Sequence, residues 1–168
     1  MKYDFLKISV ALLLSLYLIH SDFNPFNSFM HGVNFGFHEI GHMVFRPFSE
    51  FLYVAGGSIF QILVPVFCSI YFFYRGKLFS GALVLLWVGN NFFDVAVYAN
   101  DAVFMELPLW SWSGNEATTI HDWNYLLTKT NSLQYTNLIT QIIQGIGGLI
   151  TLAGICGAFY FTRKEENF

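Results

Sequence analysis

The sequence predicts an all-α integral membrane protein, and its composition carries this prediction. Of the 168 residues, 55% are hydrophobic and 20% are aromatic. Only 11% are charged, against roughly a quarter in soluble domains. The mean hydropathy is +0.50. We therefore expect one transmembrane helical domain over residues 1–168, with the lipid bilayer as its main solvent.

Four apolar runs are long enough to cross the ~30 Å hydrocarbon core of a bilayer. They cover residues 5–20, 51–74, 78–100 and 138–161. The apolar core of the first run, residues 8–19, follows Lys2 and Lys7, as the core of a signal peptide would. Because no small-x-small cleavage site comes after it, we interpret it as a retained span.

A shorter apolar segment, residues 33–48, is either a fifth span or a half-inserted helix. If it crosses the membrane, the eight Lys and Arg residues divide four against four. If it does not cross, six of them lie on the inner side, and only Arg46 and Lys129 lie outside. This distribution favours four spans, with both termini in the cytoplasm and the half-inserted helix on the outer face of a plasma membrane.

The remaining long segment, residues 101–137, mixes polar and aromatic residues and contains no apolar run that could span a membrane. A segment of this length in a compact protein is typically functional. We expect an amphipathic loop that caps the outer face of the bundle.

Two classes of function are excluded by charge and cysteine content. The net charge of −3 and the scattered basic residues provide no basic stripe for nucleic acid. Cys68 and Cys156 lie far apart within apolar runs, so the sequence indicates neither a disulfide framework nor a cysteine zinc site.

The clearest chemical motif is His38-Glu39-Ile40-Gly41-His42. On a helix the two histidines lie one turn apart on one face, so both can bind one metal ion. Glu39 would then accept a proton from a water molecule that the metal activates. A pattern this short also arises by chance. In an apolar segment, however, charged residues that face lipid cost ~2–3 kcal/mol each, which favours a metal site.

The motif resembles that of the site-2 protease class of intramembrane zinc metalloproteases. The resemblance covers about residues 33–102. In that family the His-Glu-x-x-His helix supplies two zinc ligands and the catalytic Glu, and an Asp on a later span supplies the third ligand. The segment from Gly57 to Gln61 is similar to the family's Gly-Pro-x-x-Asn segment. The region around Asn90 and Asp94 lacks the proline found near the family's Asp.

A polar stripe on the third span offers the third ligand. Asn90, Asp94, Tyr98 and Asp101 share one face of an otherwise apolar helix. Such a stripe either joins helices by hydrogen bonds or marks a functional site. If the motif helix enters from the outer side near residue 33, Asp94 lies at the depth of the two histidines. We therefore predict Asp94 as the ligand, with Asp101 at the rim, paired with His121.

Several further residues are candidates for supporting roles. His121 and Asp122 could supply a ligand or a lid contact, or simply cap a short helix that begins at Trp123. Gln61 precedes Pro65 on the second span and could face a substrate strand that enters where the helix bends. We interpret His20 and His31 as interfacial residues that bind no metal.

The last span carries a face of small residues that we interpret as a close-packing surface, either within the bundle or between copies in an oligomer. These residues are Gly147, Thr151, Gly154 and Ala158.

Three hypotheses for the function follow. The first is a Zn²⁺-dependent intramembrane metallopeptidase that cleaves a membrane-associated polypeptide, with His38, His42 and Asp94 on the metal and Glu39 as general base. The second is a non-hydrolytic metal- or haem-binding membrane protein for transport, sensing or assembly. The third is a structural subunit whose polar residues only join helices. Only hydrolysis requires Glu39 beside an open metal position.

Overall fold

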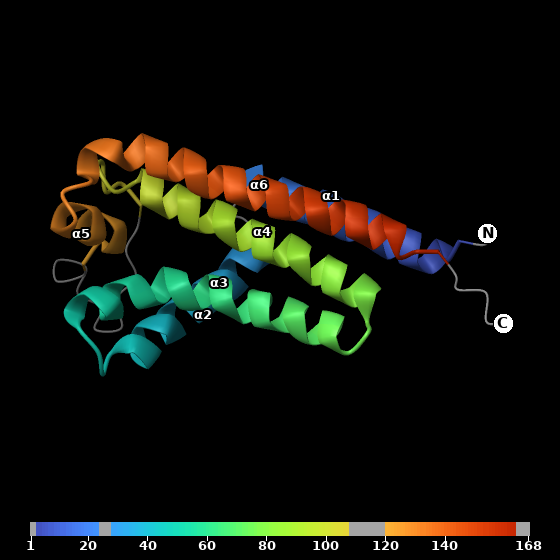
Figure 1. The fold of residues 1–168 in the computed structure, drawn as a ribbon. Helices are drawn as coiled ribbons and strands as arrows, with labels where there is room; N and C mark the ends of the chain where they lie inside the picture. Colours follow the sequence, from blue (N-terminus) through green and yellow to red (C-terminus); the bar gives the residue numbers. More distant parts are fainter. Residues whose placement is uncertain (1–2, 24–27, 108–119, 164–168) are drawn as a thin grey trace.

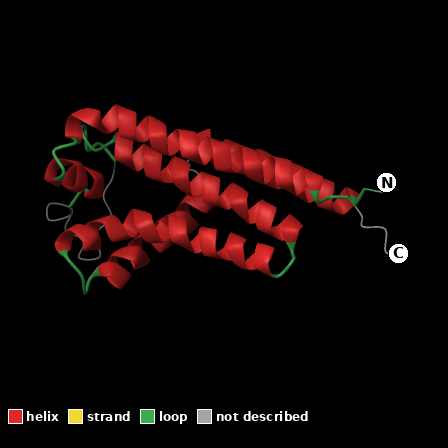
Figure 2. Cartoon of the chain, in the orientation of Figure 1, coloured by secondary structure: helices red, strands yellow, loops and turns green. Residues whose placement is uncertain are grey.

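The computed structural model describes residues 3–23, 28–107 and 120–163. Throughout these residues the regular structure is helical (Figure 2), and four helices are long and apolar enough to cross a membrane. The all-α class and the four membrane-length helices are confirmed, so the chain is a multi-pass membrane protein by length and composition. The four helices are α1 (Phe5–Phe23), α3 (Glu50–Tyr74), α4 (Leu78–Asn100) and α6 (Thr136–Tyr160).

Three shorter elements lie between them: α2 (Phe29–Phe45), α5 (Asp122–Lys129) and the 3₁₀ turn η3 (Leu133–Tyr135). The motif is on α2. Two helices have a serine as their N-cap residue. The Ser28 hydroxyl accepts a hydrogen bond from the His31 N–H at the start of α2, and the Ser49 hydroxyl accepts one from the Leu52 N–H at the start of α3.

The helices divide the molecule into two ends (Figure 1). Both termini and the turn between α3 and α4 lie at one end, and α5 and the turn between α2 and α3 lie at the other. Tyr3 pairs with Arg163 in an isolated antiparallel bridge, which fastens the start of α1 to the end of α6. Gly76 closes the α3–α4 turn with φ +69°, a conformation that favours glycine.

Helix α4 forms the centre of the bundle. Of the most apolar stretch of each membrane-length helix, the share that is buried inside the structure is 56% in α4, against 22% in α1, 33% in α3 and 17% in the span that contains α6. The predicted small-residue face of α6 packs against it. A Cβ built on Gly154 would lie 3.0 Å from the Leu86 backbone nitrogen, and one on Gly89 would overlap the Thr151 hydroxyl. The close-packing surface is therefore used within the bundle.

Candidate metal centre

The motif histidines face into the bundle from α2 and meet a carboxylate from α5. The Nε2 atoms of His38 and His42 lie 3.1 Å apart. Oδ2 of Asp122 lies 2.9 Å from the first and 3.1 Å from the second. These three residues form a buried group whose ligand atoms could hold one metal ion. His38 and Asp122 are 84 positions apart in the chain, so only the tertiary fold brings them together.

The second ring nitrogen, Nδ1, of both motif histidines lies beside a hydrogen-bond acceptor. Nδ1 of His42 lies 2.9 Å from the carbonyl oxygen of Tyr53, which can only accept a hydrogen bond. Nδ1 of His38 lies 3.2 Å from Oε1 of Gln61. A neutral imidazole that donates through Nδ1 carries a lone pair on Nε2. Two such lone pairs and a carboxylate oxygen therefore converge on one point, where they repel one another unless a proton or a metal cation lies between them.

The separation of the three atoms fits a metal ion. Ligand atoms at tetrahedral angles and ~2.05 Å from a zinc ion are ~3.3 Å apart. The observed separations of 2.9–3.1 Å are shorter by a few tenths of an ångström, so small ring movements would complete the site. One oxygen of Asp122 is close to both nitrogens, which is the arrangement of a monodentate ligand.

A glycine on α3 leaves space beside these nitrogens. A Cβ built on Gly57 would lie 2.6 Å from Nε2 of His38 and 2.7 Å from Nε2 of His42. Its neighbour Gly56 packs against Gly41 of the motif. A Cβ built on Gly41 would lie 2.3 Å from the Gly56 carbonyl oxygen. Gly41 and Gly56 therefore let α2 and α3 approach closely, and Gly57 keeps the space at the histidines open.

Helix α5 is fastened over the site by contacts to two long helices. Nε1 of Trp123 donates to the hydroxyl of Ser58 on α3 at 3.2 Å. The backbone N–H of Asp122 donates to the hydroxyl of Tyr98 on α4 at 3.1 Å. The Tyr98 ring also lies edge-on to His38, with ring centroids 5.7 Å apart. These contacts fix the helix that carries Asp122.

The expected pair of Asp101 and His121 is present. Nδ1 of His121 accepts from the Asn124 N–H and so caps α5, which leaves Nε2 to donate to Oδ2 of Asp101 at 3.1 Å. The carboxylate also accepts from the N–H groups of Glu106 and Leu107. Burial acts to raise the pKa of Asp101, but these hydrogen bonds outweigh it, and the pKa lies below its ordinary value. Residues 108–119 of the predicted capping loop lie outside the described residues.

Electrostatics stabilise charge at the candidate centre. Burial acts to raise the pKa of Asp122, but hydrogen bonds and the proximity of His38 and His42 lower it overall, so the carboxylate is ionised. Burial acts to lower the pKa of His42, but the hydrogen bond and charge of Asp122 raise it overall, with smaller contributions from Tyr53 and Glu39. The site therefore attracts positive charge, either a proton or a metal ion.

Asp94 lies in a different polar network, deeper along α4. Its Oδ1 atom is 3.2 Å from Nδ1 of His31, and its Oδ2 atom accepts from the side-chain amide of Asn34. The same amide donates to Asn90 Oδ1 at 2.9 Å, and its oxygen accepts from Trp87 Nε1 at 2.8 Å. This network joins α2 to the middle of α4. The carboxylate that the structure places beside the motif histidines is therefore that of Asp122, not that of Asp94.

The direction of α2 explains the difference. The prediction of Asp94 as a ligand depends on an entrance of the motif helix on the outer side near residue 33. In the structure Asn34 contacts the middle of α4, whereas His38 contacts Tyr98 near the end of that helix. The helix therefore begins deep in the bundle and runs toward α5, which corrects that premise.

The supporting residues divide between the two networks. Gln61 is the hydrogen-bond partner of His38, and Asn90 belongs to the deeper network, where it also donates to Asp22 Oδ1 at 2.6 Å. Glu39 is half-buried next to His38, and its charge reaches His42. No local pattern predicts a site role for Gly57 or for the Tyr53 carbonyl, although the Gly56-Gly57 pair is typical of close helix contact.

Comparison of the chain with models of protein families, with curated proteins and with solved structures found no match.

Proposed function

We propose that this protein is a zinc-dependent intramembrane metallopeptidase whose metal ligands are His38, His42 and Asp122. The observation that supports it best is the convergence of two imidazole lone pairs and an ionised carboxylate on one point, with the outer nitrogen of each ring held by an acceptor. Three protein ligands of this kind, with one position left open, are typical of catalytic zinc sites.

Glu39 adds the feature that distinguishes hydrolysis from binding. When bound, zinc supplies a Lewis acid that polarises the scissile carbonyl and makes a water molecule more acidic. Glu39 would take one proton from that water as the water oxygen bonds to the carbonyl carbon. Glu39 would then deliver that proton to the nitrogen as the carbon–nitrogen bond breaks. The second proton of the water passes from the new carboxylic acid to the amine, so the products are one carboxylate and one ammonium group.

The surroundings favour a substrate that comes from the membrane. The site lies between α2, α3, α4 and α5. Helices α3 and α6 begin and α4 ends at the same end of the bundle as α5 (Figure 1). The outward side of α2 is apolar, with Ile40 and Met43 about half exposed at 45% and 54%. A membrane-associated polypeptide could reach α2 through lipid, whereas α5 covers the site from the end of the bundle.

Two amino-acid substitutions test this proposal. Glu39→Gln preserves the shape of the side chain and removes the base, so we expect it to retain zinc while turnover falls by ~10²-fold or more. Glu106→Gln is the matched control, because the Glu106 side chain is exposed and is not one of the proposed ligands. The substrate is identified as a membrane polypeptide that accumulates with Glu39→Gln but not with wild type. Its cleavage by each purified protein is then measured in proteoliposomes.

The possible results separate the three hypotheses. Metal analysis of wild type should give about one zinc per chain. Equal polypeptide patterns and equal cleavage with Glu39→Gln would exclude the peptidase and favour the metal-binding alternative. Wild type with no more metal than the double variant His38→Ala/His42→Ala would exclude both. Iron in place of zinc would also redirect the proposal, since two histidines and a carboxylate suit non-haem iron.

For the orientation we propose that both termini lie in the cytoplasm of a plasma membrane. Lys7, Lys77 and Arg163 gather at the end of the bundle that holds the termini, as the positive-inside rule requires of that side. With Cys68 and Cys156 replaced, a cysteine at exposed Thr128 should react with an impermeant reagent in intact cells. Reaction only after the membrane is opened would reverse the orientation.

A further inference from the structure

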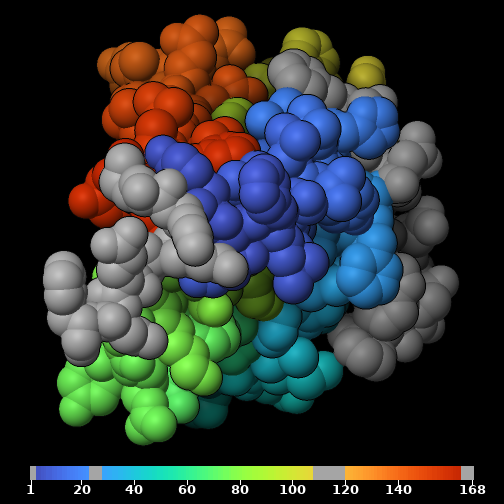
Figure 3. Space-filling model, turned by 90° about the vertical axis from the view of Figure 1, so that its right-hand side faces the viewer, coloured from blue at the N-terminus to red at the C-terminus, as the bar shows by residue number. Residues whose placement is uncertain are grey.

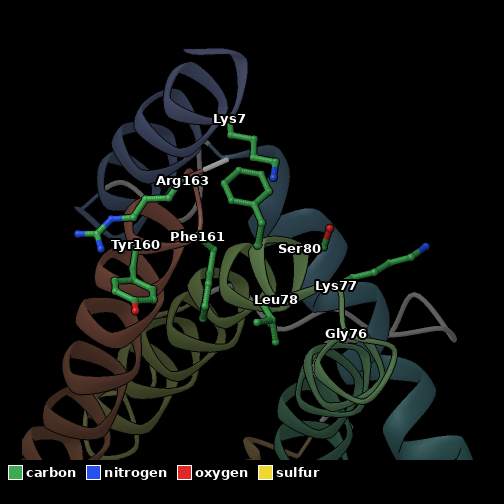
Figure 4. Close-up of a pocket in the computed structure, with 9 residues that line it drawn as sticks. Lys7, Gly76, Lys77, Leu78, Ser80, Tyr160, Phe161 and Arg163 are labelled. Carbon is green, nitrogen blue, oxygen red and sulfur yellow. The ribbon is translucent and has the colours of Figure 1, made fainter. Parts of the chain in front are cut away.

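A pocket lies at the end of the bundle opposite the candidate metal centre. The start of α1, the turn between α3 and α4, and the end of α6 meet at this end (Figure 3). The pocket between them has a volume of about 740 Å³, which is within the ~300–1,000 Å³ of small-molecule sites (Figure 4). No part of the proposed hydrolytic chemistry uses it.

Three cationic side chains line this pocket, and its described lining contains no Asp or Glu. They are Lys7, Lys77 and Arg163, which approach from three different elements and lie on different sides (Figure 4). The Lys7 ammonium lies 5.5 Å from the ring centroid of Phe79, and the Arg163 guanidinium lies 4.8 Å from that of Tyr160. Cation–π contacts of this kind hold the charges near the pocket without neutralising them.

The first turn of α4 adds further positive potential. Leu78, Phe79 and Ser80 line the pocket, and the first N–H groups of a helix have no partner within it. Lys77 precedes them without a side-chain capping bond, and this turn contains no acidic residue. The positive end of the α4 dipole therefore lies between the sides from which the three cations approach, so an anion is the complementary ligand.

The position of the pocket identifies the source of the anion. Helices α1, α3, α4 and α6 all begin or end beside it, which places it at the level of lipid headgroups if these helices span the membrane. Its walls also contain apolar side chains, among them Leu78 and Phe161. Such walls suit the glycerol and first acyl carbons of a lipid, whereas a free phosphate has no apolar part to bury.

We propose that this pocket binds the headgroup of an anionic phospholipid. The phosphodiester lies among Lys7, Lys77 and the first turn of α4, and Arg163 closes the side next to α6. Because the cations are spread around an open mouth, they select negative charge rather than one headgroup shape. This inference is independent of the proposed peptidase function.

Native mass spectrometry of the purified full-length protein tests the proposal. The protein in neutral detergent receives equal amounts of phosphatidylglycerol and phosphatidylcholine, and the bound lipid is counted. We expect wild type to retain more phosphatidylglycerol than phosphatidylcholine. The double variant Lys7→Gln/Lys77→Gln should bind it about 25-fold more weakly, from ~1 kcal/mol for each cation near anionic lipid.

The matched control is Arg46→Gln/Lys129→Gln, which removes two positive charges at the other end of the molecule and should retain the wild-type preference. Equal binding of the two lipids by wild type would overturn the proposal. Undiminished phosphatidylglycerol binding by Lys7→Gln/Lys77→Gln would do so as well, as would an equal loss in the control. Displacement of the lipid by millimolar inorganic phosphate would identify a soluble-anion site instead.

Discussion

Adding one methyl group at Gly57 should strongly weaken metal binding without weakening the helix that carries this glycine. The new Cβ of Gly57→Ala would lie 2.6 Å from Cε1 and Nε2 of His38 and 2.7 Å from Nε2 of His42. These distances are ~0.9 Å inside the optimal contact of ~3.5 Å. Both rings must move by several tenths of an ångström, whereas metal–ligand distances tolerate about ±0.2 Å.

The expected result is a large loss of metal affinity in a folded protein. Displaced ligands should weaken zinc binding by about 100-fold or more, which corresponds to ~2.7 kcal/mol. The helix itself should gain, since alanine is ~1 kcal/mol better than glycine in a helix interior. We therefore expect an unchanged helical circular dichroism spectrum and a zinc content well below one per chain. Competition with a calibrated chelator measures the affinity.

Gly36→Ala provides the matched control, because a Cβ at Gly36 on the motif helix would meet nothing within 4 Å. This variant should bind zinc as wild type does. If Gly57→Ala also bound zinc with wild-type affinity, the two Nε2 atoms would not be the metal-binding atoms, and the proposed centre would be refuted.

Three further predictions concern the ligands and their partners. Asp122→Ala should lose zinc, because the Asp122 carboxylate reaches the motif histidines, whereas Asp94→Ala should retain it, because Asp94 is bonded to Asn34. Metal analysis that gives the opposite pattern would restore the ligand expected from the sequence. Gln61→Leu should weaken zinc binding by ~10–100-fold, because it removes the hydrogen-bond partner of His38 Nδ1. The control Gln141→Leu, at an exposed position, should bind zinc as wild type does. Equal affinities of the two variants in a chelator competition would exclude a role of Gln61 in orienting His38. In metal-free protein, burial lowers the pKa of His42 but Asp122 raises it overall above 6.5. The stability that this pair contributes is fully present below pH 6.5 and is lost as the pH rises through the higher folded value. Thermal unfolding of His42→Ala should lack this pH dependence, and identical profiles would contradict the pairing.

Local sequence patterns were sufficient to predict the helices. Hydropathy over a window depends only on neighbouring residues, so the runs at residues 51–74 and 78–100 correspond closely to α3 (Glu50–Tyr74) and α4 (Leu78–Asn100). The helical period likewise placed His38 and His42 on one face. The short helix after His121 was also visible, since a polar residue precedes it and Asp122 stands in its first turn.

The third ligand could not be predicted in this way. Asp94 and Asp122 are both plausible by residue type, and the choice depends on the direction of α2 and on where α5 docks. Neither is encoded in a local pattern, because both result from contacts across the bundle such as Asn34 with Asn90 and Trp123 with Ser58. The role of Gly57 is equally non-local, since its missing side chain has meaning only opposite the two histidines.

The separation of the ligands along the chain has a consequence for biogenesis. His38 and Asp122 are 84 positions apart, with α3 and α4 between them. A nascent chain that has not yet produced α5 holds only two of the three ligands, so the centre cannot mature on the ribosome before that helix emerges. Under the proposed assignment, the centre is therefore completed only after α5 has docked against α2 and α3.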